Sequence, residues 1–492
     1  MWQHEACELA CPNPFLAFLI TMPRLIASFF LLPTIALVLL SNSLSAAVAV
    51  RSVSDADKVA VASKTRKVGC AIPIGGALKY DNAEVWSRLV TLSGGKGARW
   101  FVFPTASASP EKSAQQIIAA LEGHGALAEM VPLSDKLPGK NIADIISDQA
   151  WAEKIKNANG VYFAGGAQER ITAALFTKDG ERSLMLQAIW QMFEAGGVVA
   201  GSSAGAAIMS ETMFREPPDN LTILRQGAKR GIEISQGLGF VGKNILVDQH
   251  FLKRGRIGRL LPVMAQENIT LGLGVEENSA AIVCGDNVEV IGSRGVLLID
   301  ARNARAGGAY QAFLPYSATN VALTYLDSGD KINLATGVVS VAAIKLAGDR
   351  LDHNQPNFKP YNKSVKFYPD MLGDNTIVHA MGALLDSSAL ETRGLAFATD
   401  ANNANNATNS EIGFEFRLYK TKDTRGYFSS ARGNEDYSII RMGLDVVPVR
   451  MASPLYAPLT QAPRPTKLGE NATPAASAAD KVQTAPTLPK VK

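Results

Sequence analysis

Short apolar segments alternate with amphipathic ones from about residue 67 to residue 300, and this alternation restricts the fold more than any other feature. The apolar segments predict buried strands, at Val68–Pro73, Trp100–Phe103, Gly160–Phe163, Gly197–Ala200, Ile245–Val247, Leu271–Val275 and Ala281–Val283. Helices are predicted at Ser113–His124, Gln168–Phe176, Leu184–Ala195 and Arg256–Glu267. The pattern is typical of an α/β protein with a doubly wound, mostly parallel sheet. Ligands of such sheets bind beyond the carboxyl ends of the strands, so residues that follow strands are the first site candidates.

A nucleophile elbow is predicted where the strand ending at Ala200 meets a helix of small residues. The sequence Gly201-Ser202-Ser203-Ala204-Gly205 has the Gly-x-Ser-x-Gly pattern in this strand–turn–helix context. Because the two glycines leave no side chains beside Ser203, its Oγ is expected to stand exposed above the sheet. The backbone amide of Ala204 would then point at an oxyanion. The alternative is a Gly/Ser turn without chemical consequence.

A serine hydroxyl needs a general base, and His250 is the best candidate. It follows the apolar strand Ile245–Val247, whereas the other histidines after the N-terminal segment lack such a position: His124, His353 and His379. The base needs an acid to orient it, and the strand Leu271–Val275 ends on Glu276 and Glu277. Consecutive strand residues face opposite ways, so only one of the two can reach the histidine, and the residues alone do not choose.

Charged and small residues near these positions extend the candidate site. Asp248 is a rival orienting acid, but its place two residues before His250 suits a substrate contact better. Arg254, Arg256 and Arg259 form a guanidinium cluster that could clamp a carboxylate, although such a cluster is also typical of a solvated basic face. Gly165-Gly166 follows another strand, which makes Gly166 a second candidate oxyanion donor or part of a plain turn.

The N-terminal segment predicts export. Residues 1–47 contain a basic start at Met22-Pro23-Arg24, an apolar stretch and small residues near Ala47, the pattern of a cleaved signal peptide. Met22 could be the true start, and an uncleaved membrane anchor is the alternative. Residues 48–66 are polar and read as a linker. Removal of the signal peptide leaves two cysteines, Cys70 and Cys284. The sequence does not decide whether they are buried free thiols or form a disulfide.

The pattern of predicted secondary structure changes near residue 300. Residues 301–451 predict a β-rich appended region, with strands such as Val321–Leu326 and Lys331–Ala335 joined by a hairpin turn at Asp327-Ser328-Gly329-Asp330. Residues 452–492 are rich in Pro, Ala, Thr and Lys and predict a disordered tail. The catalytic region is therefore expected at residues 67–300.

Charge and motif content exclude several classes of function. The 492 residues hold 49 basic and 45 acidic side chains, a net charge of +4, which argues against a dedicated nucleic-acid binder. The histidines and cysteines have no metal-ligand spacing, so neither metal nor cofactor is expected.

Four motifs together resemble those of the cyanophycinases, serine peptidases of family S51 related to peptidase E. They occur in the family's order: Phe163-Ala164-Gly165-Gly166-Ala167-Gln168, Gly201-Ser202-Ser203-Ala204-Gly205-Ala206, Asp248-Gln249-His250-Phe251 with the three arginines, and Gly274-Val275-Glu276-Glu277. The resemblance implies a fold like class I glutamine amidotransferases, Ser203 as nucleophile, His250 as base and Glu277 as orienting acid. It implies substrate-pocket roles for Gln168, Asp248, Arg254, Arg256 and Arg259. Ala167 departs from the Asn or Asp usual in the family.

The resemblance also implies a substrate and a cellular setting. Cyanophycinases hydrolyse cyanophycin, a poly-aspartate backbone with arginine on each β-carboxyl, to β-Asp-Arg dipeptides. With the signal peptide, this favours a secreted enzyme, periplasmic or extracellular, with no stable membrane span after cleavage and with the dimerisation common in the family. An Asp-specific or isoaspartyl dipeptidase and a non-catalytic polymer-binding protein are the alternatives.

Overall fold

The computed structural model describes residues 68–307, 314–398, 412–433 and 435–451, and all of them fall in one compact unit. The predicted signal peptide (1–47), linker (48–66) and tail (452–492) lie outside the described residues. Among the described residues no helix is long and apolar enough to cross a membrane.

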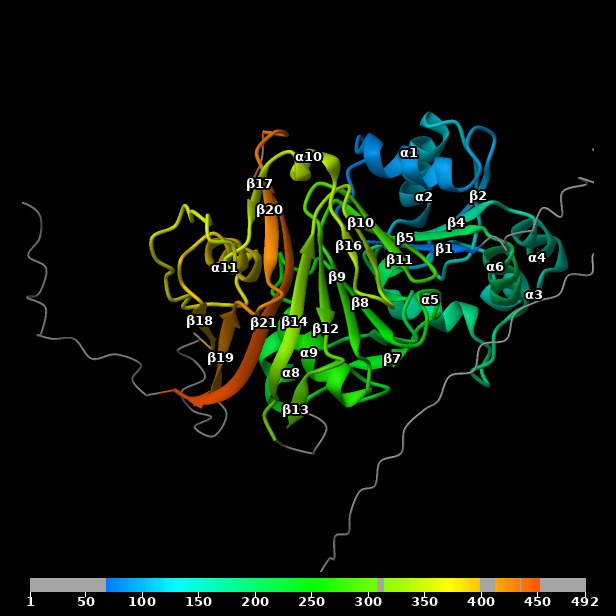
Figure 1. Cartoon of the computed structure of the whole chain (residues 1–492). Helices are drawn as coiled ribbons and strands as arrows, with labels where there is room; N and C mark the ends of the chain where they lie inside the picture. Colours follow the sequence, from blue (N-terminus) through cyan, green and yellow to red (C-terminus); the bar gives the residue numbers. More distant parts are fainter. Residues whose placement is uncertain (1–67, 308–313, 399–411, 434, 452–492) are drawn as a thin grey trace, which may run out of the picture. The chain divides into compact units, whose positions relative to one another are not determined.

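The first sheet has nine strands among the described residues, in the order β16-β15-β11-β10-β1-β5-β4-β2-β3 (Figure 1). Its parallel part runs from β1 to β3, which confirms the predicted alternation of strands and helices. The remaining strands, from β10 to β16, are antiparallel. The strands are β1 (Cys70–Ile74), β2 (Arg99–Phe103), β3 (Leu127–Met130), β4 (Gly160–Phe163), β5 (Val198–Ser202), β10 (Ser279–Cys284), β11 (Asn287–Gly292), β15 (Lys331–Asn333) and β16 (Val339–Ser340).

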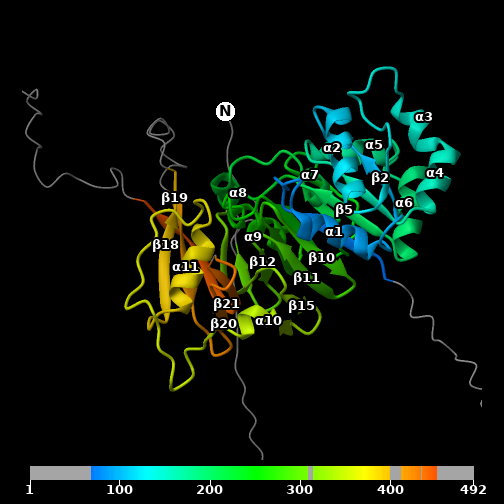
Figure 2. The same ribbon diagram turned by 90° about the horizontal axis from the view of Figure 1, so that it is seen from above.

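Helices cover both faces of the parallel part, as a doubly wound sheet requires (Figure 2). On one face α1 and α2 pack through Trp86, Leu89 and Ile117. On the other face α4, α5 and α6 pack through residues such as Ile155, Ile171 and Ile189. These helices and their neighbours are α1 (Ala83–Leu92), α2 (Pro110–Gly123), α3 (Ile142–Ser147), α4 (Gln149–Lys156), α5 (Gln168–Leu175), α6 (Leu184–Glu194) and α7 (Ala204–Ala207).

Two predicted strands of the catalytic region belong to a second sheet instead. There β8 and β9 pair in parallel, and β9 continues through antiparallel β12, β14, β21, β20 and β17, while β18 joins through β19 and β13 pairs with β14. The strands are β8 (Ile245–Gln249), β9 (Leu271–Val275), β12 (Val296–Asp300), β13 (Arg305–Gly307), β14 (Ser317–Leu326), β17 (Asp349–Leu351), β18 (Glu391–Ala396), β19 (Ile412–Tyr419), β20 (Arg425–Ser429) and β21 (Asp436–Arg450). A small pair, β6 (Thr212–Phe214) and β7 (Ile234–Gln236), completes the strands.

Apolar side chains of the second sheet form their own core with the remaining helices. The helices α8 (Asn220–Gln226) and α9 (Ile257–Gln266) bury residues such as Leu224, Leu260 and Leu261 in this cluster. Helix α11 (Thr376–Leu385) packs against β19 and β21, and a single turn, α10 (Ala343–Leu346), lies near β20 (Figure 1). The sheet thus builds one core from residues on both sides of position 300.

Strands on either side of residue 300 pair with each other, although the change in sequence pattern suggested a domain boundary there. The strand β12, which ends at Asp300, pairs along its whole length with β14. The predicted hairpin at Asp327–Asp330 is wrong, because β14 stays in the second sheet while β15 pairs with β11 of the first. The turn therefore carries the chain from one sheet to the other.

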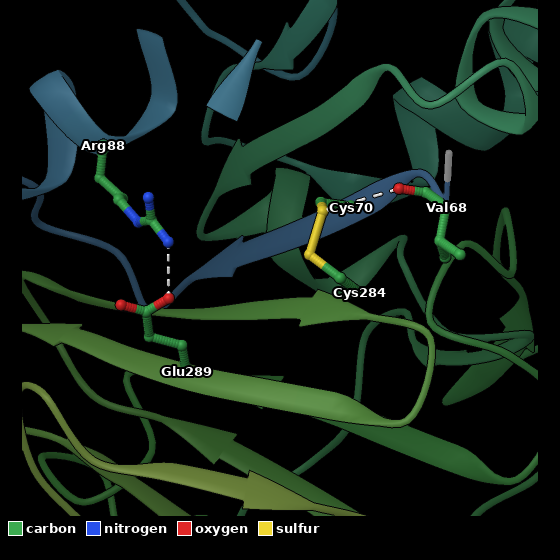
Figure 3. The surroundings of a disulfide bond; sticks show 5 residues. All are labelled: Val68, Cys70, Arg88, Cys284 and Glu289. Atoms are coloured by element: carbon green, nitrogen blue, oxygen red, sulfur yellow. Dashed lines mark hydrogen bonds and ion pairs between the residues drawn. A yellow bond between two sulfur atoms is a disulfide. The ribbon is translucent and has the colours of Figure 1, made fainter. Parts of the chain in front are cut away.

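A disulfide joins Cys70 and Cys284, which resolves the alternative that the sequence left open (Figure 3). The two residues are directly opposite each other in the antiparallel pair β1 and β10, with their Cα atoms 4.4 Å apart. Beside the disulfide, Arg88 of α1 forms an ion pair with Glu289 of β11 at 2.7 Å. The covalent link ties the first parallel strand to the antiparallel half of the sheet.

Candidate active site

Four chain segments meet at one edge of the two sheets. In the first sheet Ile74 lies opposite Ser202, so the residues after β1 and β5 leave the sheet side by side. In the second sheet Gln249 lies opposite Val275, so His250 and Glu276 also emerge together. This is the carboxyl edge of the parallel strands, where the sequence analysis placed the site.

The segment after β1 holds the other three segments through its backbone. The carbonyl oxygens of three consecutive residues accept amide hydrogen bonds: Ile74 from Ser203 at 3.0 Å, Gly75 from His250 at 2.6 Å and Gly76 from Asn278 at 2.8 Å. Each donor is a predicted site residue or directly follows one. The relative positions of the three segments are thus fixed by main-chain bonds rather than by side chains alone.

Ser203 occupies a strained turn between β5 and α7. Its φ of 54° and ψ of −108° lie outside the regions that non-glycine residues favour, as expected of a nucleophile elbow. The flanking glycines are required by close packing, since a Cβ at Gly201 would lie 2.5 Å from the Gly205 oxygen. At Gly205 a Cβ would lie 2.2 Å from the Phe163 oxygen. The predicted elbow is therefore present, but α7 is one turn long, so its dipole contributes little.

Ser203, His250 and Glu277 form a continuous hydrogen-bond relay. The Oγ of Ser203 lies 3.0 Å from Nε2 of His250, and Nδ1 of His250 lies 2.6 Å from Oε1 of Glu277. Burial lowers the pKa of His250 below its ordinary value of 6.5, and Arg254 and Arg256 lower it further. The hydrogen bond to Glu277 raises the pKa and opposes these effects. The result is a neutral imidazole at pH 7, ready to accept the serine proton.

The adjacent glutamates have different partners. Only Glu277 contacts His250, whereas the Oε2 of Glu276 accepts the backbone amides of Leu252 at 2.5 Å and Lys253 at 2.9 Å. Glu276 is 1% exposed. It thus holds the turn that follows His250, a role that the sequence analysis did not foresee.

Asp248, Arg256 and Arg259 pair with one another. Arg259 contacts both oxygens of Asp248, at 2.7 and 2.6 Å, and Arg256 lies 3.2 Å from the same carboxylate. All three side chains are buried, and the Arg259 guanidinium stacks 4.3 Å from the ring centroid of Phe214. Burial lowers the pKa of Arg256 to about 10, while Asp248 raises it. Because these charges are already paired, the network is suited to supporting His250 rather than to clamping a ligand directly.

Arg254 and Gln168 do not belong to this ion-pair network. The side chain of Arg254 is exposed and forms no hydrogen bond or ion pair with the described residues. Gln168 donates from Nε2 to the carbonyls of Phe214 at 2.9 Å and Arg215 at 2.8 Å, which leaves its side-chain oxygen available. Of the five predicted pocket residues, these two retain groups that could bind a substrate.

The candidate oxyanion donors lie close to the serine. A Cβ at Gly165 would be 3.3 Å from the Cβ of Ser203, so the glycine pair approaches the nucleophile closely. Gly166 has a φ of +143°, and a Cβ there would be 1.9 Å from the Ala106 oxygen. Ala204 begins α7, so its amide has no partner within that helix. Donation from Ala204 and Gly166 to an oxyanion stays a prediction.

Gly75 and Gly76 are site residues that the sequence analysis missed. A Cβ at Gly76 would lie 2.3 Å from Nε2 of His250, and one at Gly75 would lie 2.0 Å from the Glu276 oxygen. The signal was present, since a glycine pair follows the apolar strand β1 just as Gly165-Gly166 follows β4. Among the described residues no group of three or more His, Cys, Asp or Glu side chains is placed to hold a metal ion.

An α/β fold with a Ser–His–Glu relay at the carboxyl edge of parallel strands has the geometry of a hydrolase. Residues 73–291 match the model of peptidase family S51. The class is therefore that of a peptidase.

The chain is also similar in sequence to several cyanophycinases. The chain is 27% identical over 274 residues to a cyanophycinase of Synechococcus elongatus, covering 54% of this chain and 80% of that protein. It is 28% identical over 282 residues to a cyanophycinase of Trichormus variabilis, covering 56% and 88%. Among solved structures, a peptidase from an acI-B1 Actinobacterium aligns with 55% of this chain and 98% of its own, at 19% identity and a TM-score of 0.39.

Proposed function

We propose that this protein is an exported serine peptidase that hydrolyses cyanophycin to β-Asp-Arg dipeptides through an acyl-enzyme on Ser203. The observation that carries the proposal is the relay from Ser203 Oγ through His250 to Glu277, at 3.0 and 2.6 Å. The similarity to cyanophycinases over about half of the chain supports the choice of polymer.

The relay provides the proton transfers of amide hydrolysis. Ser203 Oγ attacks the scissile carbonyl carbon while its proton moves to Nε2 of His250, and the carbonyl oxygen becomes an oxyanion facing the amides of Ala204 and Gly166. The oxyanion collapses, the C–N bond breaks, and His250 gives its proton to the leaving amine. Water then attacks the ester and loses a proton to His250, which returns it to Ser203. Glu277 holds the imidazole tautomer and stabilises the imidazolium.

Substrate recognition at the relay falls to the groups that remain unpaired. Exposed Arg254 can contact a carboxylate of the arginine or aspartate unit, and the side-chain oxygen of Gln168 can accept from an amide or a guanidinium. The buried set of Asp248, Arg256 and Arg259 supports the turn that carries His250. Two such polar contacts would orient the scissile amide.

Export is supported by the disulfide as well as by the N-terminal pattern. Disulfides persist in secreted and periplasmic proteins and are rare in reducing compartments. The Cys70–Cys284 link therefore agrees with the signal peptide predicted at residues 1–47. N-terminal sequencing of the protein recovered outside the cytoplasm tests this: a start near residue 48 supports export, and an intact Met1 or Met22 contradicts it.

Product analysis tests the activity itself. Purified protein is incubated with insoluble cyanophycin, and soluble products are identified by liquid chromatography and mass spectrometry. We expect β-Asp-Arg from the wild type and none above background from Ser203→Ala. Hydrolysis of short Asp-containing or isoaspartyl peptides without hydrolysis of the polymer would instead indicate a dipeptidase.

Ser202→Ala is the matched control, because the neighbouring serine lies on the same turn but hydrogen-bonds toward buried Tyr162. We expect this variant to keep its activity. Undiminished turnover in Ser203→Ala would remove Ser203 from the mechanism, and equal losses in both variants would point to damage of the turn.

A further inference from the structure

A cavity of about 850 Å³ lies at the acid end of the relay and is lined by both halves of the chain. Glu277 belongs to its wall, whereas Ser203 and His250 do not. Residues after 300 also line it, including Asp327 directly after β14, Tyr361, and Asp436 at the start of β21. The cavity is therefore adjacent to the catalytic residues but separate from the nucleophile.

Charges of both signs line this cavity. The acidic residues Asp327 and Asp436 are each only 6% exposed, so they form its floor. The basic residues Lys79, Lys253 and Arg294 are exposed and lie at its rim, together with one exposed acid, Glu435. A ligand with a cationic tip and an anionic group nearer its attachment point would match the buried acids and the exposed bases.

Asp327 retains an open acceptor among the buried acids of the cavity. Its Oδ1 accepts the amide of Ser328 at 2.7 Å, but its Oδ2 accepts no hydrogen bond from the described residues. Burial raises the pKa of Asp327 to about 6, against the effect of Lys345. Oδ2 of Asp436 likewise accepts no hydrogen bond from the described residues, although it forms an ion pair with Nε of Arg432 at 3.2 Å. A buried carboxylate with an open oxygen facing a cavity is suited to a hydrogen-bonding cation.

Aromatic side chains complete the wall. Tyr361 is 87% exposed although it lines the cavity, and Tyr325 and Tyr437 lie deeper. The planar guanidinium group stacks on aromatic faces and donates bidentately to carboxylates, whereas an ammonium group does neither as well. The lining therefore favours a guanidinium over a lysine-like cation.

We propose that this cavity is an accessory subsite that binds an arginine unit of the substrate polymer, with the guanidinium on Asp327 and the α-carboxylate toward Lys79 and Arg294. The proposal rests on the proposed function, because a β-Asp-Arg unit keeps a free guanidinium and a free carboxylate on each arginine. A polymer held at both places would place one amide at Ser203 while another unit occupies the cavity. This assigns a substrate-binding role to the region after residue 300.

Binding to the inactive Ser203→Ala protein tests the subsite without catalysis. The probe is Nα-acetyl-L-arginine, followed by isothermal titration calorimetry, with Nα-acetyl-L-citrulline as the ligand control that lacks the cation. We expect arginine binding to weaken at least ~10-fold in Tyr361→Ala and Asp327→Asn, and citrulline to bind at least ~10-fold more weakly than arginine. Exposed Asp423→Asn, outside the cavity, is the matched control and should bind as the parent does.

Polymer assays then separate this proposal from the proposed function. In the active protein, Tyr361→Ala should raise KM for cyanophycin several-fold and leave kcat/KM for a single-amide substrate unchanged. If the wild type cleaves cyanophycin but neither cavity variant changes arginine binding or polymer KM, the subsite proposal fails alone. If the wild type does not cleave cyanophycin but arginine binding still depends on Asp327 and Tyr361, the proposed function fails and the guanidinium site stands.

Discussion

Gly76 packs against the imidazole of His250 so closely that a Cβ at residue 76 would lie 2.3 Å from Nε2, the atom that faces Ser203. The backbone of Gly75 meanwhile accepts the amide of His250 at 2.6 Å. The glycine pair after β1 thus fixes the position of the His250 backbone and limits the orientation of its imidazole. Neither residue has a side chain that could take part in the reaction.

Gly76→Ala is expected to lower kcat/KM at least ~100-fold, because the methyl group would displace the imidazole from Ser203 by about 1 Å. Steady-state kinetics on the polymer or on a chromogenic peptide measures this loss. The control is Gly97→Ala: Gly97 has a positive φ of +82°, but a Cβ added there would meet no atom within 4 Å. That variant should lose about 1 to 3 kcal/mol of stability from backbone strain and keep its kcat/KM. Similar activity in the two variants would contradict the proposed contact.

The pH dependence of kcat/KM should show an acid limb below pH 6.5. The neutral form of His250 is the active base, and its population rises as pH rises through its pKa. Since burial, Arg254 and Arg256 lower that pKa, the limb falls on the acid side of the ordinary value. Arg254→Gln removes one cation and should move the limb to higher pH. A limb above 6.5 in the wild type would mean that the bond to Glu277 outweighs burial.

The adjacent glutamates should respond differently to the same substitution. Glu277→Gln leaves the size of the side chain unchanged but removes the charge that stabilises the imidazolium, so kcat should fall ~10²- to 10⁴-fold. Glu276→Gln weakens two buried hydrogen bonds to the amides of Leu252 and Lys253, and should lower the free energy of unfolding by about 1 to 3 kcal/mol. Kinetics and urea denaturation of both variants separate the effects. Reversal of the pattern would exchange the roles of the two residues.

Asp248→Asn should strongly destabilise the protein. The substitution leaves the buried guanidinium groups of Arg256 and Arg259 without a carboxylate, which costs about 3 to 5 kcal/mol. Exposed Arg254→Gln serves as the comparison and should change the free energy of unfolding by less than about 0.5 kcal/mol while raising KM. Chemical denaturation at pH 7 measures both. A loss below about 1 kcal/mol in Asp248→Asn would show that the ion-pair network is not needed for the fold.

Local sequence patterns were sufficient to predict many of the secondary-structure elements and the types of the catalytic residues. The strand candidates ending at Phe103, Phe163 and Val275 coincide with β2, β4 and β9, because short apolar runs between turns are buried wherever the sheet places them. The elbow at Ser203 was recognisable from its local pattern, although only Gly201 is required by a contact within the turn, while Gly205 is required by a contact with Phe163 of β4. The residues alone could not choose between Glu276 and Glu277, because both follow β9 and the choice depends on which side chain points toward His250.

Strand partners and charge partners were decided only by the tertiary structure. Strand periodicity is identical in every sheet, so nothing in Ile245–Val247 reveals that β8 and β9 belong to the second sheet. An arginine cluster looks the same whether it faces solvent or a buried aspartate, so the pairing of Asp248 with Arg256 and Arg259 appears only when α9 packs behind β8. The sequence thus determined which residue types stand at the carboxyl edges of the strands. The fold decided which of them meet, because those contacts join positions far apart along the chain.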